Sequence, residues 1–474
     1  MPNTQKTEFH RVRTAGLAGL FFLSGAAGLG YQVVWAKAFG AGIGHEFAAV
    51  LAVVSAFMSG MAAGAFLFGK VPERWRYDAR AYGILELLAG LWGGASVLFI
   101  PKLNSLVIQM LGIDPPFWRH WLCVFGTVLA ALFPATAAMG ATLPALERLV
   151  FRLRGQSVTG LLYGVNTLGA MVGALGAAFW LIRYLGIGRT LWAFAALNIV
   201  CGCLALALSR SCRSAFVPLK ETGGPKRELS LGVRLFCTGF LGIGFETVVI
   251  RALSQILEST VYTFAVVLAI YLAGAAAGAA AYYKFKNGRT IEEAHLFQGL
   301  ALSCFLSGLV LRWMPAAYQH LRTAWGDSLW AVALAEGGTT MIVFLPPSFF
   351  MGATFTALAE ASLQRQPTLS WSVALNSLGG AAGPAVFGLL LIPFLGLKLS
   401  WAAVVLGYLA FSGPSKRWLL PTGALLSLLL TPSTELIQRQ EQKLVHFRDG
   451  VLGSVAVLES ANGARVLKVN NRFQ

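Results

Sequence analysis

The sequence predicts an all-α polytopic membrane protein with two parallel six-helix repeats and a short C-terminal β-hairpin. An apolar composition, twelve apolar segments and an internal duplication predict it. Of the 474 residues, 56% are hydrophobic and 12% charged, and the mean hydropathy is +0.67. Soluble chains carry about 25% charged residues. A water-soluble globular enzyme is therefore excluded, and a lipid bilayer is the expected surrounding.

Each predicted span is an apolar run of roughly the length that crosses a bilayer. The first, 17–34, is longer than the roughly 7–15 apolar residues of a secretory signal, so we interpret it as a membrane helix. A shorter apolar run, 418–430, suits a helix that lies in the membrane interface. The other predicted spans are 47–69, 82–100, 118–139, 161–185, 191–208, 235–253, 262–283, 296–311, 329–350, 373–395 and 401–411.

The basic residues predict the orientation. The net charge of +17 comes from Lys and Arg residues between apolar segments, not from runs among aromatic residues, so nucleic acid is not an expected partner. Over alternate loops these residues divide 22 to 9, with six more after residue 430. The loops with 22 include the N-terminus and face the cytoplasm under the positive-inside rule. We therefore predict a multi-pass protein of the cell (inner) membrane with a cytoplasmic N-terminus.

The sequence contains an internal repeat. At an offset of 214, polar residues recur together with glycines, which chance matching of small residues does not explain. Repeats that each contain an even number of helices enter the membrane in the same direction. This is the arrangement of the major facilitator transporters, whose substrate site lies between the halves. At this offset Gly25, Gly28, Gly30, Gln32, Lys37, Gly60 and Gly64 match Gly239, Gly242, Gly244, Glu246, Arg251, Gly274 and Gly278. Farther along the chain, at slightly smaller offsets, Pro134, Met139, Thr142, Asn166, Gly169, Gly173 and Gly186 match Pro346, Met351, Thr354, Asn376, Gly379, Gly383 and Gly396.

The repeat divides the chain into five parts. These are a first six-helix repeat (1–209), a cytoplasmic linker (210–230), a second six-helix repeat (231–413), a short extra hydrophobic helix (414–431) and a tail (432–474). Pairs of glycines four residues apart in both repeats predict close helix packing, with a sliding surface as the alternative.

Carboxylates within the predicted spans are candidates for a substrate or ion site because burying them in a membrane is costly. Glu246 and Glu336 lie near the middle of their spans, and Glu86 lies closer to an end. They could bind a cation or carry a coupling proton, and the alternative is a structural pair. Gln32, Asn166 and Asn376 are further candidates, for which interhelical hydrogen bonds are the structural alternative. Arg251 and Lys37 are expected to snorkel to the interface. The six cysteines show no metal-ligand spacing, so no metal site is predicted.

The tail has a different character. Residues 433–445 form a polar stretch that suggests a helix, and the apolar runs 454–458 and 465–469 flank Asn462-Gly463, which predicts a β-hairpin. Because a lone hairpin is marginal in water, we interpret it as the start of an incomplete domain and expect it to be weakly packed.

Several motifs carry a resemblance to a known family. They are Ser24-Gly-Ala-Ala-Gly28 with Tyr31-Gln-Val-Val-Trp35, Met139-Gly-Ala-Thr-Leu-Pro144, Leu162-Tyr-Gly-Val-Asn-Thr-Leu-Gly169 and Leu467-Lys-Val-Asn-Asn-Arg-Phe-Gln474. With these the chain resembles membrane proteins in which a transporter-like region is fused to a spermidine synthase-like domain. The last motif resembles the synthase pattern Leu-x-Leu-Asp-Gly-x-x-Gln, with Asn470 and Asn471 in place of Asp and Gly.

The resemblance implies two functions. One is a transporter-like module of unknown substrate, with a polyamine or another cation as candidate. The other is a truncated or split membrane-bound aminopropyltransferase whose helices serve as an anchor. The family's glutamine contacts decarboxylated S-adenosylmethionine, so Gln474 matches a cofactor-binding position. The glycine-rich loop and the catalytic Asp of the family have no counterpart, so no cofactor and no catalysis are expected in this chain alone, and a separate or fused synthase-like domain is a candidate partner. We expect a cytoplasmic tail, where this cofactor occurs.

The orientation can be tested with a reporter inserted in the linker at 210–228. We expect a cytoplasmic signal, since the basic loops lie on that side. A periplasmic signal would contradict both the orientation and the parallel arrangement of the repeats.

Overall fold

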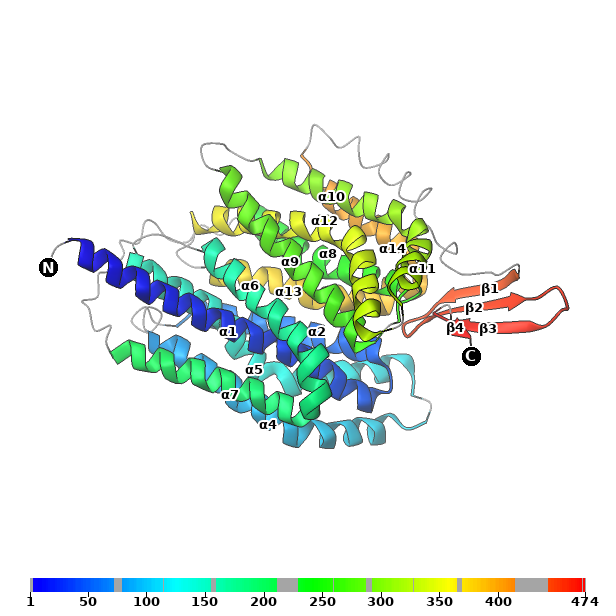
Figure 1. Ribbon diagram of the computed structural model, residues 1–474, viewed down its shortest axis with the longest axis horizontal. Helices are drawn as coiled ribbons and strands as arrows, with labels where there is room; N and C mark the ends of the chain where they lie inside the picture. The colour runs from blue at the N-terminus through cyan, green and yellow to red at the C-terminus, as the bar shows by residue number, and fades with distance from the viewer. Residues whose placement is uncertain are drawn as a thin grey trace.

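The computed structural model is a bundle of long helices with a small β-sheet at one end (Figure 1). It describes residues 3–71, 79–113, 115–154, 159–210, 229–258, 260–286, 292–326, 328–364, 369–413, 442–470 and 472–473. We call the end of the bundle where α7 ends and α8 begins the linker end, and the other end the sheet end. The N-terminus lies at the linker end, opposite the sheet (Figure 1).

The helices follow the two predicted halves. The first half contains α1 (Asn3–Ile43), α2 (Glu46–Gly69), α4 (Ala79–Leu111), α5 (Phe117–Arg154), α6 (Thr159–Gly176), the π-helix η1 (Ala177–Leu181) and α7 (Ile182–Arg210). The second half contains α8 (Leu229–Leu253), α9 (Val261–Lys286), α10 (Glu293–Val310), the 3₁₀-helix η2 (Leu311–Trp313), α11 (Met314–Trp325), α12 (Leu329–Leu363), α13 (Ser370–Ala385), the π-helix η3 (Val386–Leu391) and α14 (Ile392–Leu409).

Two glycines bring the number of membrane crossings to twelve. The described part of the chain has ten helical stretches long and apolar enough to span a membrane, but Leu162–Leu208 and Ser370–Leu409 contain 47 and 40 residues. At about 1.5 Å per residue these are roughly 70 and 60 Å long, twice a bilayer core. Each is broken by a glycine in a conformation essentially reserved for glycine: Gly186 (φ 76°, ψ 173°) and Gly396 (φ 80°, ψ 169°). The twelve predicted spans are therefore confirmed.

The internal repeat is visible in the helix packing. In the first half α1 packs on α6, α2 on α5 and α4 on α7; in the second half α8 packs on α13, α9 on α12 and α10 on α14. The π-helices η1 and η3 occupy equivalent places before the two glycine breaks. The halves meet where α2 packs on α13 and α6 on α9. Two parallel six-helix repeats are the architecture of the major facilitator transporters.

Within each half, glycines allow helix backbones to touch. A Cβ atom added to Gly169 in α6 would lie 1.9 Å from the backbone oxygen of Phe22 in α1, and one on the equivalent Gly379 would lie 2.0 Å from that of Phe236. The same relation holds between α2 and α5 and between α9 and α12. The glycine pairs therefore serve as packing positions inside the halves, as the first interpretation predicted. The other members of these pairs are Gly60, Gly64, Gly173, Gly274, Gly278 and Gly383.

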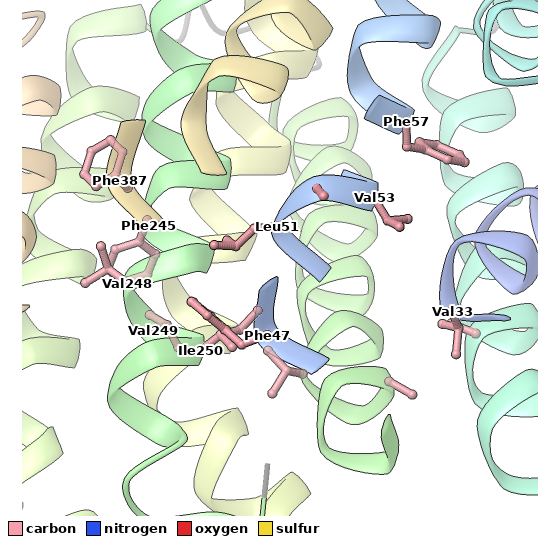
Figure 2. Packing of buried hydrophobic residues seen from close by; sticks show 14 of the residues in the cluster. Val33, Phe47, Leu51, Val53, Phe57, Phe245, Val248, Val249, Ile250 and Phe387 are labelled. Atoms are coloured by element: carbon pink, nitrogen blue, oxygen red, sulfur yellow. The ribbon is translucent and has the colours of Figure 1, made fainter. Parts of the chain in front are cut away.

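Apolar side chains of α2 join the two halves. Phe47 and Leu51 point toward Phe245 and Ile250 of α8, whereas Val53 and Phe57 point away from that helix (Figure 2). A Cβ on Gly388 in η3 would lie 2.6 Å from Leu51 Cδ1. The α2 helix is thus held between its own half and the second one.

The tail forms an antiparallel sheet with the strand order β1 (Lys443–Asp449), β2 (Ser454–Glu459), β3 (Arg465–Val469) and β4 (Arg472–Phe473). The predicted hairpin is β2 and β3, with Gly463 at φ 79° in its turn. The predicted helix over 433–445 is wrong for residues 443–445, which belong to β1 because this strand pairs with the open edge of β2. The short helix predicted at 418–430 lies outside the described residues.

The side of the tail also differs from the expectation. A cytoplasmic tail requires the sheet to share the linker end with the N-terminus, but the sheet lies at the other end (Figure 1). The physical reason is that β1 and its following turn bind helix ends there, as described below.

The packing role of the glycines can be tested in α6. We expect Gly169→Ala to lower the free energy of unfolding by about 1–3 kcal/mol, the usual effect of overpacking a close contact, measured by thermal unfolding in detergent. Gly164→Ala in the same helix is the control, because nothing lies within 4 Å of a Cβ there. Equal stability of the two variants would contradict the close contact.

Candidate functional site

A central cavity lies between the halves. It has about 1390 Å³ of empty space, counting its part open to solvent. It is lined mainly by α1, α2, α5 and α6 of the first half and α8, α9, α12 and α13 of the second, with one residue each from α10 and α14. These helices are the ones that pack in equivalent pairs across the repeat. A pocket enclosed by both repeats is where transporters of this architecture hold their substrates.

Repeat-equivalent residues line this cavity from opposite sides. Met139 and Thr142 of one repeat line the cavity, and so do the equivalent residues Met351 and Thr354 of the other repeat. The duplicated polar positions found in the sequence therefore meet in space. The other equivalent lining pairs are Gln32 with Glu246, Asn166 with Asn376, and Thr167 with Ser377.

Glu246 is the charged residue of the cavity. It lies in the second half of α8, is 7% exposed, and is the sole Asp, Glu, Lys or Arg among the described lining residues. Within the described part of the chain its carboxylate has no ion pair. A carboxylate without a cationic partner inside a membrane bundle is costly, and the open space in front of it can admit a cation or a proton.

Gln32 faces the same space from α1. It is 7% exposed, and its Oε1 atom accepts no hydrogen bond from the described residues. The repeat thus places an amide and a carboxylate at equivalent positions, and of these two residues Glu246 is the one that can carry a charge.

A second pocket continues toward the sheet end. It has about 560 Å³ of empty space between α1, α2, α8 and α9, and both Gln32 and Glu246 line it as well as the central cavity. Farther out it is lined by Lys37 and Glu46, which form an ion pair. Gln32 and Glu246 therefore lie at the junction between the central cavity and an outer pocket.

Aromatic contacts bridge the two halves at both ends of the space between them, and we call these two contacts the closures. At the linker end the rings of Tyr163 (α6) and Phe355 (α12) lie 5.6 Å apart. At the sheet end Phe179 of η1 stacks on Trp330 at 5.3 Å and contacts Tyr262 at 5.1 Å. Each closure joins one half to the other, so separation of the halves at either end would open the cavity there.

The two predicted asparagines line the cavity and also hold helices together. Asn376 Nδ2 donates to the backbone oxygen of Leu235 and to Thr238 Oγ1, both at 3.2 Å, which ties α13 to α8. Asn166 packs against Gly25, since a Cβ there would lie 2.2 Å from the Asn166 backbone oxygen. Both asparagines line the cavity, and the Asn376 amide uses part of its hydrogen-bonding capacity between helices.

Glu86 and Glu336 are not among the residues that line the cavity. Glu336 differs from the expectation of a carboxylate between the halves, because its oxygens accept hydrogen bonds from the backbone N of Glu258 (3.0 Å) and from Thr263 Oγ1 (2.9 Å). Glu86, 1% exposed, accepts a hydrogen bond from Ser24 Oγ at 2.5 Å between α4 and α1. Gln474, the residue matched to the cofactor, lies outside the described residues.

Sequence reasoning missed part of the site. Tyr271 and Tyr408 line the cavity, and the Tyr408 hydroxyl has no partner among the described residues. Neither belongs to a motif shared by the repeats, so the duplication gives no signal for them. The prediction that Arg251 snorkels is wrong: it is 1% exposed, and its guanidinium carbon lies 5.4 Å from the centroid of the Phe47 ring.

Comparison with known proteins gives a likeness to solved structures. No protein-family model and no curated protein matches the chain in sequence. Among solved structures, the chain is similar to a bacterial homologue of the human lysosomal transporter Spinster in an inward-facing and occupied conformation, with 14% identity over 88% of this chain and 96% of that one, at a TM-score of 0.42. A likeness this distant says nothing about what the present chain binds.

His45, which precedes α2 at the sheet end, provides a test of the electrostatics there. Burial, and then the charge of Arg251, lower the pKa of His45 below its usual value, against a smaller opposing effect of Glu46. As pH falls, His45 binds a proton at a higher pH in the unfolded chain than in the folded one. Folding stability is therefore lost as pH drops below the ordinary histidine pKa of about 6.5. We expect His45→Gln to reduce the loss of thermal stability between pH 7.5 and 5.5.

The control for this measurement is His320→Gln, which removes an exposed histidine of α11. It is expected to leave the pH dependence unchanged. The interpretation fails if His45→Gln retains the full wild-type loss.

Proposed function

We propose that this chain is the transport module of an integral membrane protein, that it carries a cation between its two ends, and that Glu246 binds that cation. The observation that carries the proposal is the position of Glu246: a carboxylate without an ion-pair partner among the described residues, lining the cavity between two repeats. Cations in low-dielectric sites need a compensating charge, and this cavity offers one.

The lining favours a particular kind of cation. One carboxylate compensates one positive charge, and the surrounding Phe57, Met58 and Tyr271 suit apolar or aromatic groups attached to it. A polyamine would bring further ammonium groups that find no second carboxylate among the described lining residues. We therefore favour a monovalent organic cation as substrate, with a polyamine as the second candidate.

The two closures suggest how access alternates. Separation of Tyr163 from Phe355 opens the linker end, and separation of Phe179 from Trp330 opens the sheet end. The halves contact each other through α2 on α13 and α6 on α9, so a rocking of one half on the other can open one end while it closes the other. The uneven distribution of basic residues supports a cytoplasmic linker end and N-terminus in the inner membrane of a cell.

Uptake into proteoliposomes tests the proposal with a stated probe, benzyltrimethylammonium, a monovalent aromatic cation. We expect uptake by the wild-type chain and at least a tenfold loss in Glu246→Gln, since a charge interaction in a desolvated site disappears. Glu360→Gln is the matched control, because that carboxylate pairs with Lys286 outside the cavity and its loss should leave uptake unchanged.

Three outcomes decide between the candidates. Uptake that is unchanged in Glu246→Gln removes this residue from the mechanism. Uptake of spermidine in preference to the monovalent probe supports the polyamine. No uptake of either cation contradicts the function proposed here.

A second proposal follows from the resemblance of the tail. In it the helices anchor a spermidine synthase-like domain that uses decarboxylated S-adenosylmethionine. The supporting observation is Asn470, which adopts φ 49° where the synthase pattern has Asp before Gly, and so forms a turn after β3. Spermidine formed from putrescine by the purified chain would favour this proposal over a transport module without catalysis.

A further inference from the structure

The turn between β1 and β2 binds the sheet end of the second repeat. Arg251 Nη2, in the last turn of α8, donates to the backbone oxygen of Gly450 at 2.5 Å. The backbone N of Leu397 donates to Asp449 Oδ2 at 3.2 Å. Arg251 is 1% exposed and Asp449 8% exposed, so the contact is buried on both sides. The turn therefore joins the tail to two different helices of the bundle.

The bond from Leu397 to Asp449 meets a requirement of a helix end. Leu397 follows the break at Gly396, so its N–H is among the first donors of a new helical stretch, and these lack partners within the helix. A carboxylate stabilises such an end by accepting the hydrogen bond and by opposing the helix dipole. The other oxygen, Asp449 Oδ1, accepts from Ser454 Oγ at 2.5 Å, which holds the carboxylate in place.

Comparison of the two repeats shows why the second one needs the tail. Lys37, the equivalent of Arg251, forms an ion pair with Glu46 of its own repeat. At the offset of 214 the equivalent of Glu46 is Thr260, which carries no charge. Asp449 supplies the negative charge near Arg251 instead. The tail thus provides the negative charge that the second repeat lacks at this position.

The two ends of the connection between bundle and tail lie at opposite ends of α8. Gly413 lines a pocket together with Arg234 and Glu293 at the linker end, whereas Gly450 binds Arg251. Arg234 and Arg251 are 17 positions apart, about 26 Å along a helix at 1.5 Å per residue, close to the thickness of a bilayer core. Gly413 and the sheet that begins after Gln442 therefore lie at opposite ends of the bundle.

We propose that the sheet end of the second repeat is a docking seat for the C-terminal domain of this chain, formed by Arg251 and the Leu397 helix end, and that this domain lies across the membrane from the linker. With the basic loops in the cytoplasm, the sheet faces the extracytoplasmic side. A synthase-like domain built on this sheet would then work outside the cytoplasm, away from an intracellular cofactor. The seat and the side of the domain are independent of any transport by the chain.

The side is tested by labelling single added cysteines in the full chain with a membrane-impermeant maleimide. Asn462→Cys lies in the exposed β2–β3 turn, and Lys284→Cys lies at the exposed linker end of α9. We expect Asn462→Cys to label only in intact cells and Lys284→Cys only in inside-out vesicles. Each variant is compared with the chain that carries only its native cysteines. Labelling of both from the same side would overturn the proposal, whatever the absolute orientation.

The seat is tested by hydrogen exchange of the full chain in lipid nanodiscs. We expect Asp449→Asn to speed exchange about tenfold in the segment that begins at Leu397, the factor that corresponds to one hydrogen bond to a charged group. Glu459→Gln is the matched control, because this carboxylate of the same sheet pairs with Arg465 and not with the bundle. Unchanged exchange in Asp449→Asn would overturn the seat.

Ser454→Ala serves as a milder variant if Asp449→Asn does not fold. It removes the hydrogen bond that holds the Asp449 carboxylate and leaves all charges in place. We expect faster exchange in the same segment, by a smaller factor than in Asp449→Asn. Exchange at the wild-type rate in this variant would also count against the seat.

Discussion

Close contact between helix backbones at glycine positions is the constraint on which the rest of this structure depends. In a bilayer, helices gain little from hydrophobic burial against each other, so their association depends on close packing and hydrogen bonds. Here a Cβ on Gly169 or Gly379 would fall about 2 Å from a backbone oxygen of the neighbouring helix. Each half is therefore a tightly paired unit. The halves contact each other through α2 on α13 and α6 on α9, and the cavity forms between them.

The duplication explains the shape of the site, and its departures from symmetry explain the charge. Met139 and Thr142 meet their copies across the cavity, as a pseudo-twofold arrangement requires. At the level of Gln32, however, the second repeat carries Glu246. An amide needs hydrogen bonds, whereas a carboxylate needs a proton, a metal or a cation as well. This single difference turns a structural position into a candidate binding position.

The two repeats also differ at the sheet end, in the partners of the equivalent residues Lys37 and Arg251. Lys37 is paired inside its repeat, and Arg251 is paired with the tail. Arg251 also lies near His45 and Phe47 at the start of α2, one helical turn and a little more beyond Glu246. The docked turn thus lies beside the outer pocket, because Arg251 directly follows Ile250, which lines that pocket. Any movement of α8 that opens this pocket has to move or release the turn.

The sequence by itself determined the fold class, the twelve crossings, the parallel repeat and the hairpin, because these depend on local composition and on spacing along the chain. It also indicated Gln32, Glu246, Asn166 and Asn376, because the repeat marks equivalent positions and equivalent positions meet on the axis between the halves. Only the tertiary structure separated Glu246 from Glu336: both are acidic residues inside apolar spans, but the partners of Glu336 are contributed by residues 258 and 263, more than 70 positions away. Only the tertiary structure placed the tail, because the pairing of Asp449 with Leu397 and of Gly450 with Arg251 joins segments that carry no shared pattern. Long-range partners of polar groups, unlike apolar periodicity, are decided by which helix ends the folded bundle brings together.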